Sequence, residues 1–131
     1  MNIITDILIK VKKMNRKTEK QYAEDVEKIL RFFEKNYSKN IKFADVMHIS
    51  DIGENNFKKY FKSITGTTVM HYFKKYKISR AKELIEKNQY SFTEISLILG
   101  YDSIHYFSRQ FKSIEGISPT EYKTQIKQRK E

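Results

Sequence analysis

The sequence predicts an all-α fold of about seven helices, in which two helix-turn-helix units are joined by one long linker helix. Three observations lead to this prediction. Gly occurs four times and Pro once, while Lys, Glu and Ile are abundant, which favours helices over a turn-rich β architecture. Apolar residues recur at helical spacing along most of the chain. One stretch of sequence also recurs in similar form later in the chain. The 131 residues are 39% hydrophobic and include nine Phe and nine Tyr, enough for a packed core.

The first part of the chain contains two stretches with helical spacing. Residues 1–14 place apolar side chains at such intervals, which predicts an amphipathic segment. Thr18–Gln21 then has the form of a capping box, in which two side chains satisfy the first free backbone N–H groups of a helix. Behind it, an apolar stripe extends from Tyr22 to Tyr37 and predicts a helix over roughly 19–37.

The rest of the chain predicts one long helix and several short ones. We expect a continuous helix over 70–87, because its apolar positions keep the helical period and no Gly or Pro interrupts them. A second capping box, Ser91–Glu94, begins the next helix. Pro119 stands at a first helical position, where its missing N–H costs nothing. The short helices expected are 43–49, 54–64 ended by Gly66, 92–99 ended by Gly100, 104–114 ended by Gly116, and a last one from 119.

An internal repeat defines the organisation of the chain. Residues 57–72, shifted by 50 positions onto 107–122, show seven identities in 16 positions. Upstream the offset becomes 49 and pairs Phe43 with Phe92, so the second copy has one more residue in its turn. Each copy has helix-turn-helix order. The predicted parts are an amphipathic segment or linker over 1–18, a first subdomain over 19–69, a linker helix over 70–87, and a second subdomain with a basic tail over 88–131.

The second helix of each copy divides into an apolar side and a polar side. Phe57 and Phe61, like their counterparts Phe107 and Phe111, fall on the side that we expect to pack inward. A helix that enters a DNA groove needs this division, since its other side must offer donors to bases and phosphates. An ordinary solvated helix face is the alternative. The outward residues are Asn55, Lys58, Lys59 and Lys62 in the first copy and His105, Ser108, Arg109 and Lys112 in the second.

Charge and composition narrow the classes of function. The formal net charge of +10 indicates a polyanionic partner: nucleic acid first, an anionic membrane surface second, or else only a lysine-rich solvated surface. The chain has no Cys, which excludes disulfides and thiolate chemistry and fits a reducing cytoplasm. Its three His residues lack metal-ligand spacing, and no Gly-rich phosphate loop occurs. We therefore expect no enzyme activity, no cofactor and no metal.

The N-terminal apolar run does not suggest a membrane protein. Residues 3–9 contain Asp6, are too short to cross a bilayer and lack a small-residue cleavage site. We expect neither a transmembrane segment nor a signal peptide.

One motif connects the chain to a known family. Gly-Tyr-x-x-x-x-Tyr-Phe-Ser-Arg-x-Phe-Lys stands at 100–112, and Gly-x-Ser-Pro follows at 116–119. This motif resembles the second unit of the double helix-turn-helix DNA-binding domain at the C-terminus of AraC/XylS-type transcription regulators. In the linker helix, Lys77-Ile78-x-x-Ala81 stands where that family has Arg-Ile/Leu-x-x-Ala. The resemblance covers roughly 22–123.

The resemblance implies sequence-specific binding to double-stranded DNA, with two recognition helices in successive major grooves, about 34 Å apart. Arg109 would fork onto guanine, and Asn55 or Asn56 onto adenine. Ile104 could touch only a thymine methyl. Carried over by position, the family's base-reading residues are Asn55, Asn56, Lys58 and Lys59 in the first unit, and Ile104, His105, Ser108 and Arg109 in the second, with Lys62 and Lys112 beside them.

The first unit departs from the family pattern in four places. Met47 replaces the preferred Ala, Asp51 replaces the turn Gly, and Gly53 and Lys42 replace capping residues. We expect the turn to survive, because Asp tolerates positive φ.

Two other functions stay open at this stage. A small interaction protein would pair with a related full-length regulator and antagonise it without reading DNA. Non-specific nucleic-acid binding would rely on charge alone. RNA polymerase is a further candidate partner, as is a sensor domain or a second copy of the chain acting through residues 1–20.

Overall fold

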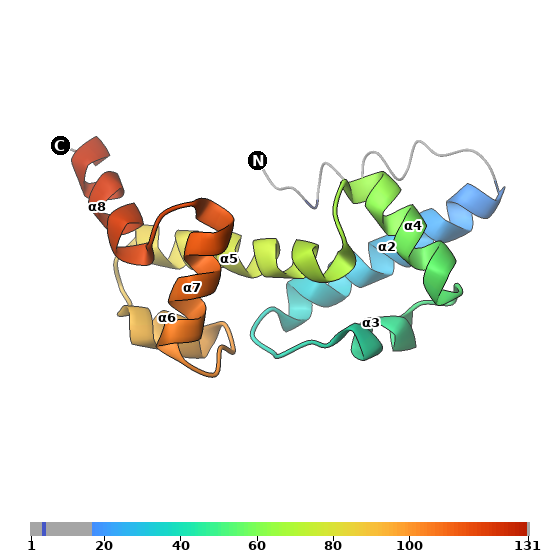
Figure 1. The fold of residues 1–131 in the computed structure, drawn as a ribbon, viewed down its shortest axis with the longest axis horizontal. Coiled ribbons are helices and arrows are strands. Elements are labelled where there is room, and N and C mark those ends of the chain that lie inside the picture. Colours follow the sequence, from blue (N-terminus) through green and yellow to red (C-terminus); the bar gives the residue numbers. More distant parts are fainter. Residues whose placement is uncertain (1–3, 5–16, 131) are drawn as a thin grey trace. The chain divides into compact units, whose positions relative to one another are not determined.

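The computed structural model describes residue 4 and residues 17–130. Over 17–130 it contains seven helices and no strand (Figure 1). This confirms the predicted all-α fold with two helix-turn-helix units and a long helix between them. The prediction of an amphipathic segment over 1–14 lies outside the described residues, except for Ile4, which is helical and 1% exposed. The helices are α2 Lys17–Asn36, α3 Phe43–Ile49, α4 Glu54–Thr65, α5 Val69–Lys87, α6 Phe92–Ile98, α7 Ile104–Glu115 and α8 Pro119–Lys130.

The helices form two compact units, and the boundary between them falls inside α5. The first unit contains α2, α3, α4 and the beginning of α5 up to Phe73. The second contains the rest of α5 from Lys74, the helices α6 to α8, and also the segment Tyr37–Asn40 that follows α2. α5 itself is one unbroken helix, as its lack of Gly and Pro predicts.

The core of the first unit is largely aromatic. Phe33 of α2 packs on Tyr72 and Phe73 of α5, with ring centroids 6.2 and 4.6 Å apart. The rings of Phe61 of α4 and Tyr72 are nearly perpendicular, with centroids 5.8 Å apart, and the Phe61 ring lies tilted beside that of Phe57 at 5.7 Å. Both Phe side chains of α4 are fully buried, so the apolar side of this helix packs inward as predicted.

The second unit repeats this packing with its own residues. Phe107 and Phe111 of α7 are fully buried, with ring centroids 6.0 Å apart, and Phe111 contacts the Tyr122 ring of α8 at 5.7 Å. The Tyr122 hydroxyl donates a hydrogen bond of 2.6 Å to the Glu86 carboxylate of α5. The buried cluster holds α7 against α5 and α8; its members are Ile78, Ala81, Ile85, Ile95, Leu99, Tyr101, Phe107, Phe111 and Tyr122.

The second unit caps its helices with side chains, and the first unit does so less completely. At α6 the predicted capping box is present: Ser91 Oγ accepts from the Glu94 N–H, and the Glu94 carboxylate accepts from the Ser91 N–H, both at 3.1 Å. At α7, Ser103 Oγ accepts from the Tyr106 N–H at 3.1 Å. Gly53, at the same place before α4, has no side chain to do this.

The turn between α3 and α4 differs from the prediction. Asp51 does not adopt positive φ; among the described residues other than Gly, only Asn88 does, at 54°. Ser50 is extended instead, with φ −73° and ψ 134°. The buried Asp25 carboxylate of α2 accepts hydrogen bonds from Ser50 Oγ at 2.5 Å and from the Asp51 N–H at 3.1 Å. A side chain of another helix therefore holds this turn, and no left-handed residue is needed.

Candidate nucleic-acid interface

α4 and α7 each present a polar face opposite a buried Phe pair. Both helices end at a glycine in the left-handed conformation, Gly66 with φ 81° and Gly116 with φ 83°. Each glycine N–H donates a 2.8 Å hydrogen bond to a carbonyl one turn back, that of Lys62 or Lys112. The repeated sequence thus builds two helices of the same length, oriented by the same aromatic contacts within their units.

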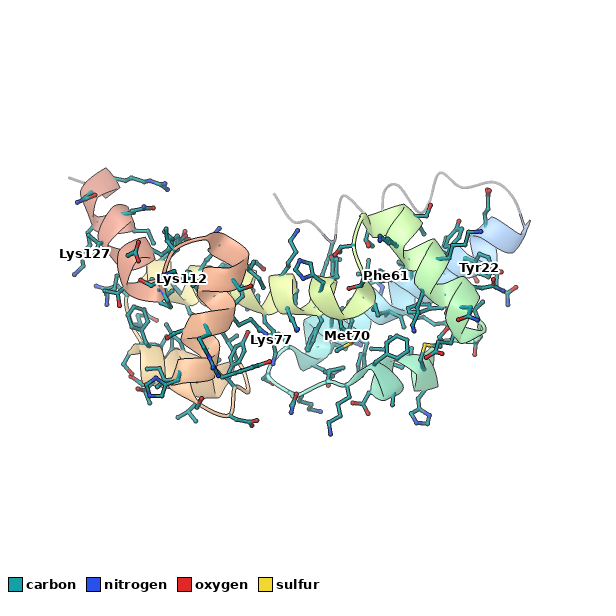
Figure 2. The ribbon with its side chains drawn as sticks, in the orientation of Figure 1. Tyr22, Phe61, Met70, Lys77, Lys112 and Lys127 are labelled. Carbon is teal, nitrogen blue, oxygen red and sulfur yellow. The ribbon has the colours of Figure 1, made fainter. Side chains whose placement is uncertain are left out.

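The polar residues predicted on these helices are accessible to different degrees. Ile104 and Ser108 of α7 are half-buried, so they offer less surface than their neighbours. The other predicted residues are exposed: Asn55, Asn56, Lys58, Lys59 and Lys62 on α4, and His105, Arg109 and Lys112 on α7 (Figure 2 labels Lys112).

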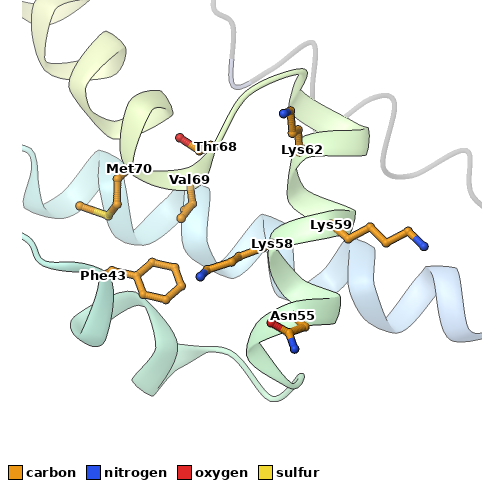
Figure 3. A pocket seen from close by; sticks show the side chains of 8 residues that line it. All are labelled: Phe43, Asn55, Lys58, Lys59, Lys62, Thr68, Val69 and Met70. Carbon is orange, nitrogen blue, oxygen red and sulfur yellow. The ribbon is translucent and has the colours of Figure 1, made fainter.

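Four of the five predicted α4 residues line one groove of about 680 Å³. Phe43, Val69 and Met70 contribute apolar lining, and Thr68, which also lines the groove, immediately precedes α5. Asn56 does not line it. Figure 3 shows the eight lining residues, which are Phe43, Asn55, Lys58, Lys59, Lys62, Thr68, Val69 and Met70.

Lys58 and Lys59 extend to opposite sides of α4 (Figure 3). The Lys58 ammonium lies 4.9 Å from the centre of the Phe43 ring, a cation–π contact. It also lies 3.8 Å from a carboxylate oxygen of Glu54, one turn earlier on the same helix. The Lys58 ammonium therefore has two partners within the protein, which its position in the motif did not reveal.

The second unit holds a buried lysine near the beginning of α7. Lys77 of α5, labelled in Figure 2, is 6% exposed, and its ammonium lies 4.7 Å from the centre of the Tyr101 ring. Burial lowers the pKa of Lys77 from 10.5 to about 8, against the opposing effect of the Asp102 charge. Tyr101 in turn donates a hydrogen bond to the Gln110 side chain of α7. These contacts tie the turn before α7 to α5 and to α7 itself.

Sequence reasoning missed Glu54, although the signal for it was available. The 50-residue offset of the repeat pairs Glu54 with Ile104, which the family pattern places among the base-reading residues. Glu54 is exposed and begins α4, as Ile104 begins α7.

Other kinds of site find no support in the described part of the chain. Over residues 17–130 and at residue 4, no three His, Asp or Glu side chains gather as a metal site would require. None of the helices described has both the length and the apolar character needed to cross a bilayer.

The fold and these two helix faces define a double helix-turn-helix domain. A family model described as "Helix-turn-helix domain" matches residues 45–125, more than half of the chain. The chain belongs to this family, in its AraC-type branch, a group of DNA-binding transcription regulators and not of enzymes.

Similar proteins agree with this assignment. The MmsAB operon regulatory protein of Pseudomonas aeruginosa is 32% identical over 78 residues, which are 60% of this chain and 25% of that protein. The probable transcriptional regulator LumQ of Photobacterium leiognathi is 29% identical over 91 residues, 70% of this chain and 37% of that protein. The chain thus spans between a quarter and two fifths of the length of these relatives.

Solved structures show the same fold. The C-terminal domain of AraT, a response regulator from Geobacillus stearothermophilus, matches with a TM-score of 0.71 and 25% identity, covering 77% of this chain and 84% of that one. The DNA-binding domain of AdpA, a global transcriptional factor solved with a target DNA, matches with a TM-score of 0.72 and 18% identity, covering 80% and 95%.

Proposed function

We propose that this chain binds specific sequences of double-stranded DNA as the DNA-reading part of a transcription regulator. One observation carries the proposal: α4 and α7 combine the same buried Phe pair with exposed hydrogen-bond donors, in a chain of net charge +10. The buried pair fixes each helix on its unit, while the donors are free to meet base edges and phosphates. The two helices enter successive major grooves of one duplex.

The proposed contacts differ in kind. Arg109 forks onto guanine, and Asn55 or Asn56 forks onto adenine, because their side chains match the paired acceptors or the donor and acceptor of those bases. Lys62 and Lys112, in the last turns of their helices, meet phosphates and give affinity without sequence preference. The remaining contacts of the proposed interface come from Lys58, Lys59, Ile104, His105 and Ser108.

The proposal also covers the parts of the chain, its location in the cell and its partners. Its parts are the segment 1–18, a first subdomain 19–69, the linker helix 70–87 and a second subdomain 88–131. It acts in the cytoplasm, where RNA polymerase and a sensor domain or second copy of the chain, joined through residues 1–20, are its further partners.

The antagonist function is the weaker alternative. A protein that only pairs with a regulator has no use for two exposed polar helix faces with matched donors, and the relatives named above are regulators themselves.

Selection of bound duplexes from a random library tests the proposal. We expect enrichment of a bipartite site whose two halves lie about one helical turn apart. Gel shifts at two salt concentrations then compare that site with a scrambled duplex. Equal affinity for both duplexes would indicate binding by charge alone, and the absence of any shift would support the antagonist function.

A further inference from the structure

The two recognition helices begin with different chemistry at equivalent positions. Glu54 is the first residue of α4, and Ile104 is the first residue of α7. In helix-turn-helix proteins, the leading end of the recognition helix is the part that meets base edges. Ile104 has no side-chain hydrogen-bonding group, whereas Glu54 has an exposed carboxylate that can only accept hydrogen bonds.

The Glu54 carboxylate is part of a three-residue arrangement. Lys58 Nζ lies 3.8 Å from Glu54 Oε1 and 4.9 Å from the centre of the Phe43 ring. Both charged side chains are a little more than half exposed, at 54% and 56%. Lys58 therefore supplies a positive charge beside a carboxylate that phosphates would otherwise repel. The Phe43 ring restricts where the Lys58 ammonium can go.

The second unit lacks this arrangement. Its counterparts of Lys58 and Phe43 are Ser108 and Phe92, and the ring of Phe92 is instead 5.7 Å from the ammonium of Lys123 on α8. The arrangement of Phe43, Lys58 and Glu54 thus distinguishes the first recognition helix from its repeat.

We infer that Glu54 selects a cytosine in the first half of the operator, accepting a hydrogen bond from the cytosine N4 amino group. Cytosine is the base whose major-groove edge offers a donor and no acceptor, which suits a carboxylate. Adenine also has an amino group, but its N7 acceptor lies next to it and repels a carboxylate. Lys58 is a positioning residue that holds Glu54 against the field of the phosphates. This inference rests on the proposed DNA-binding function.

A purely structural role for Glu54 is the competing explanation. An acidic residue in the first turn interacts favourably with the helix dipole, and a Glu–Lys pair four residues apart adds a little helix stability. That role predicts a small change in thermal stability on substitution and no change in base preference.

Selection from a random duplex library with the full 131-residue chain separates the two explanations. Wild type should enrich a C·G pair at one position of the first half-site. Glu54→Gln should shift that single position towards A·T, since the amide matches adenine, and lower the preference for C·G by about 10-fold or more. Lys58→Met should change base preference at that position only, in addition to the loss of affinity for all sites that removal of a DNA-contacting cation causes. Lys62→Met, which removes an equal charge from the same helix, should lower affinity for all sites alike.

The complementary test places the Glu54–Lys58 pair at the matching positions of the second unit. The double variant Ile104→Glu/Ser108→Lys should gain a preference for C·G, of about 10-fold, at the matching position of the second half-site. Circular dichroism verifies that each variant is folded.

The outcomes distinguish this inference from the proposed function. If wild type enriches a site but Glu54→Gln enriches the same site with unchanged preference at every position, Glu54 reads no base and the DNA-binding function stands. If Lys58→Met changes preference at a different position, Lys58 is itself a base contact and its positioning role is wrong. If wild type enriches nothing, the proposed function and this inference both fail.

Discussion

The backbone carbonyl oxygen of Ser38 occupies the space that a side chain at position 100 would need. A Cβ built on Gly100 would lie 2.1 Å from that oxygen, far inside van der Waals contact. Gly100 also has φ +74°, a conformation that residues with a side chain rarely adopt. Two independent requirements, one local and one tertiary, therefore fix glycine in the turn between α6 and α7.

Substitution of Gly100 should lower the free energy of unfolding much more than substitution of Gly116, which is also left-handed. Gly116 has φ +83° and no atom within 4 Å of its would-be Cβ, so Gly116→Ala should cost only about 1–2 kcal/mol for the left-handed conformation. Gly100→Ala should lower the free energy of unfolding by at least about 2 kcal/mol more, because backbone must also move. Urea denaturation followed by circular dichroism measures both. Equal losses would mean that Ser38 does not approach Gly100 in solution.

A substitution at Gly53 should supply the side-chain cap that α4 lacks. Gly53 has ordinary φ of −59° and nothing within 4 Å of its would-be Cβ, so a serine fits there as Ser103 does before α7. Gly53→Ser should raise the free energy of unfolding by about 0.5–1.5 kcal/mol, through the new cap and a less flexible unfolded chain. Ser103→Gly should lower it by a comparable amount. Thermal denaturation of the two variants should show shifts of opposite sign.

Stability should depend on pH through Lys77. Its pKa is about 8 in the folded chain and 10.5 in the unfolded chain, so between these values the unfolded state holds more protons. The free energy of unfolding should therefore rise from pH 8 to pH 10.5, relative to Lys77→Met, by up to about 3 kcal/mol. Below pH 8 both states are protonated and the difference should be constant.

Urea denaturation of wild type and Lys77→Met across this pH range makes the comparison. The two proteins differ only at position 77, so the difference between their curves reports the replacement of Lys77. Parallel curves would mean that the Lys77 ammonium is well solvated.

Arg109 and Lys112 should affect DNA binding differently, although both are exposed on α7 and lie three residues apart. Arg109→Ala should lose about 1–3 kcal/mol on the preferred site and become indifferent at one base pair, because a bidentate guanine contact is removed. Lys112→Ala should weaken binding to all sequences about equally. Competition with point-mutated duplexes measures this. If no position becomes indifferent in the Arg109 variant, Arg109 meets the phosphate backbone.

Binding should depend strongly on salt. If about six to eight phosphates are neutralised, the logarithm of the association constant should fall against the logarithm of salt concentration with a slope of about −5 to −7. Filter binding at several salt concentrations gives the slope, which Lys112→Ala should reduce by about one unit. A slope near zero would show that the excess of Lys and Arg over Asp and Glu serves only solubility. The cations expected to contribute are Lys59, Lys62, Lys74, Lys75, Arg109 and Lys112.

The parts of the fold that depend on local pattern could be predicted from the sequence. α5 was predictable because its helical period continues without Gly or Pro, and the ends of α4 and α7 because Gly66 and Gly116 take the left-handed conformation. The conformation of Asp51 could not be predicted from the sequence. Its turn is held by Asp25, whose contact depends on the packing of α2 and has no local signature.

The candidate site shows the same limit. Helical periodicity separates the buried Phe57 from the exposed polar residues of α4, but it does not say where a long flexible side chain goes. The direction of Lys58 is set by Phe43 and Glu54, one of them on another helix. The approach of Ser38 to Gly100 likewise joins distant parts of the chain, so the sequence predicts Gly100 as the end of a helix but not this tertiary requirement.

The way in which the second unit is assembled from the chain affects how related genes can recombine. This unit is assembled from two separate pieces of chain, Tyr37–Asn40 and the part from Lys74 onward, with α3 and α4 encoded between them. A single genetic crossover inside α5 would therefore transfer the second unit without the segment that carries Ser38. Recombination between related genes would need two further breakpoints around that segment to exchange the unit complete. The two units of this duplicated sequence therefore cannot be separated by a single cut in the chain.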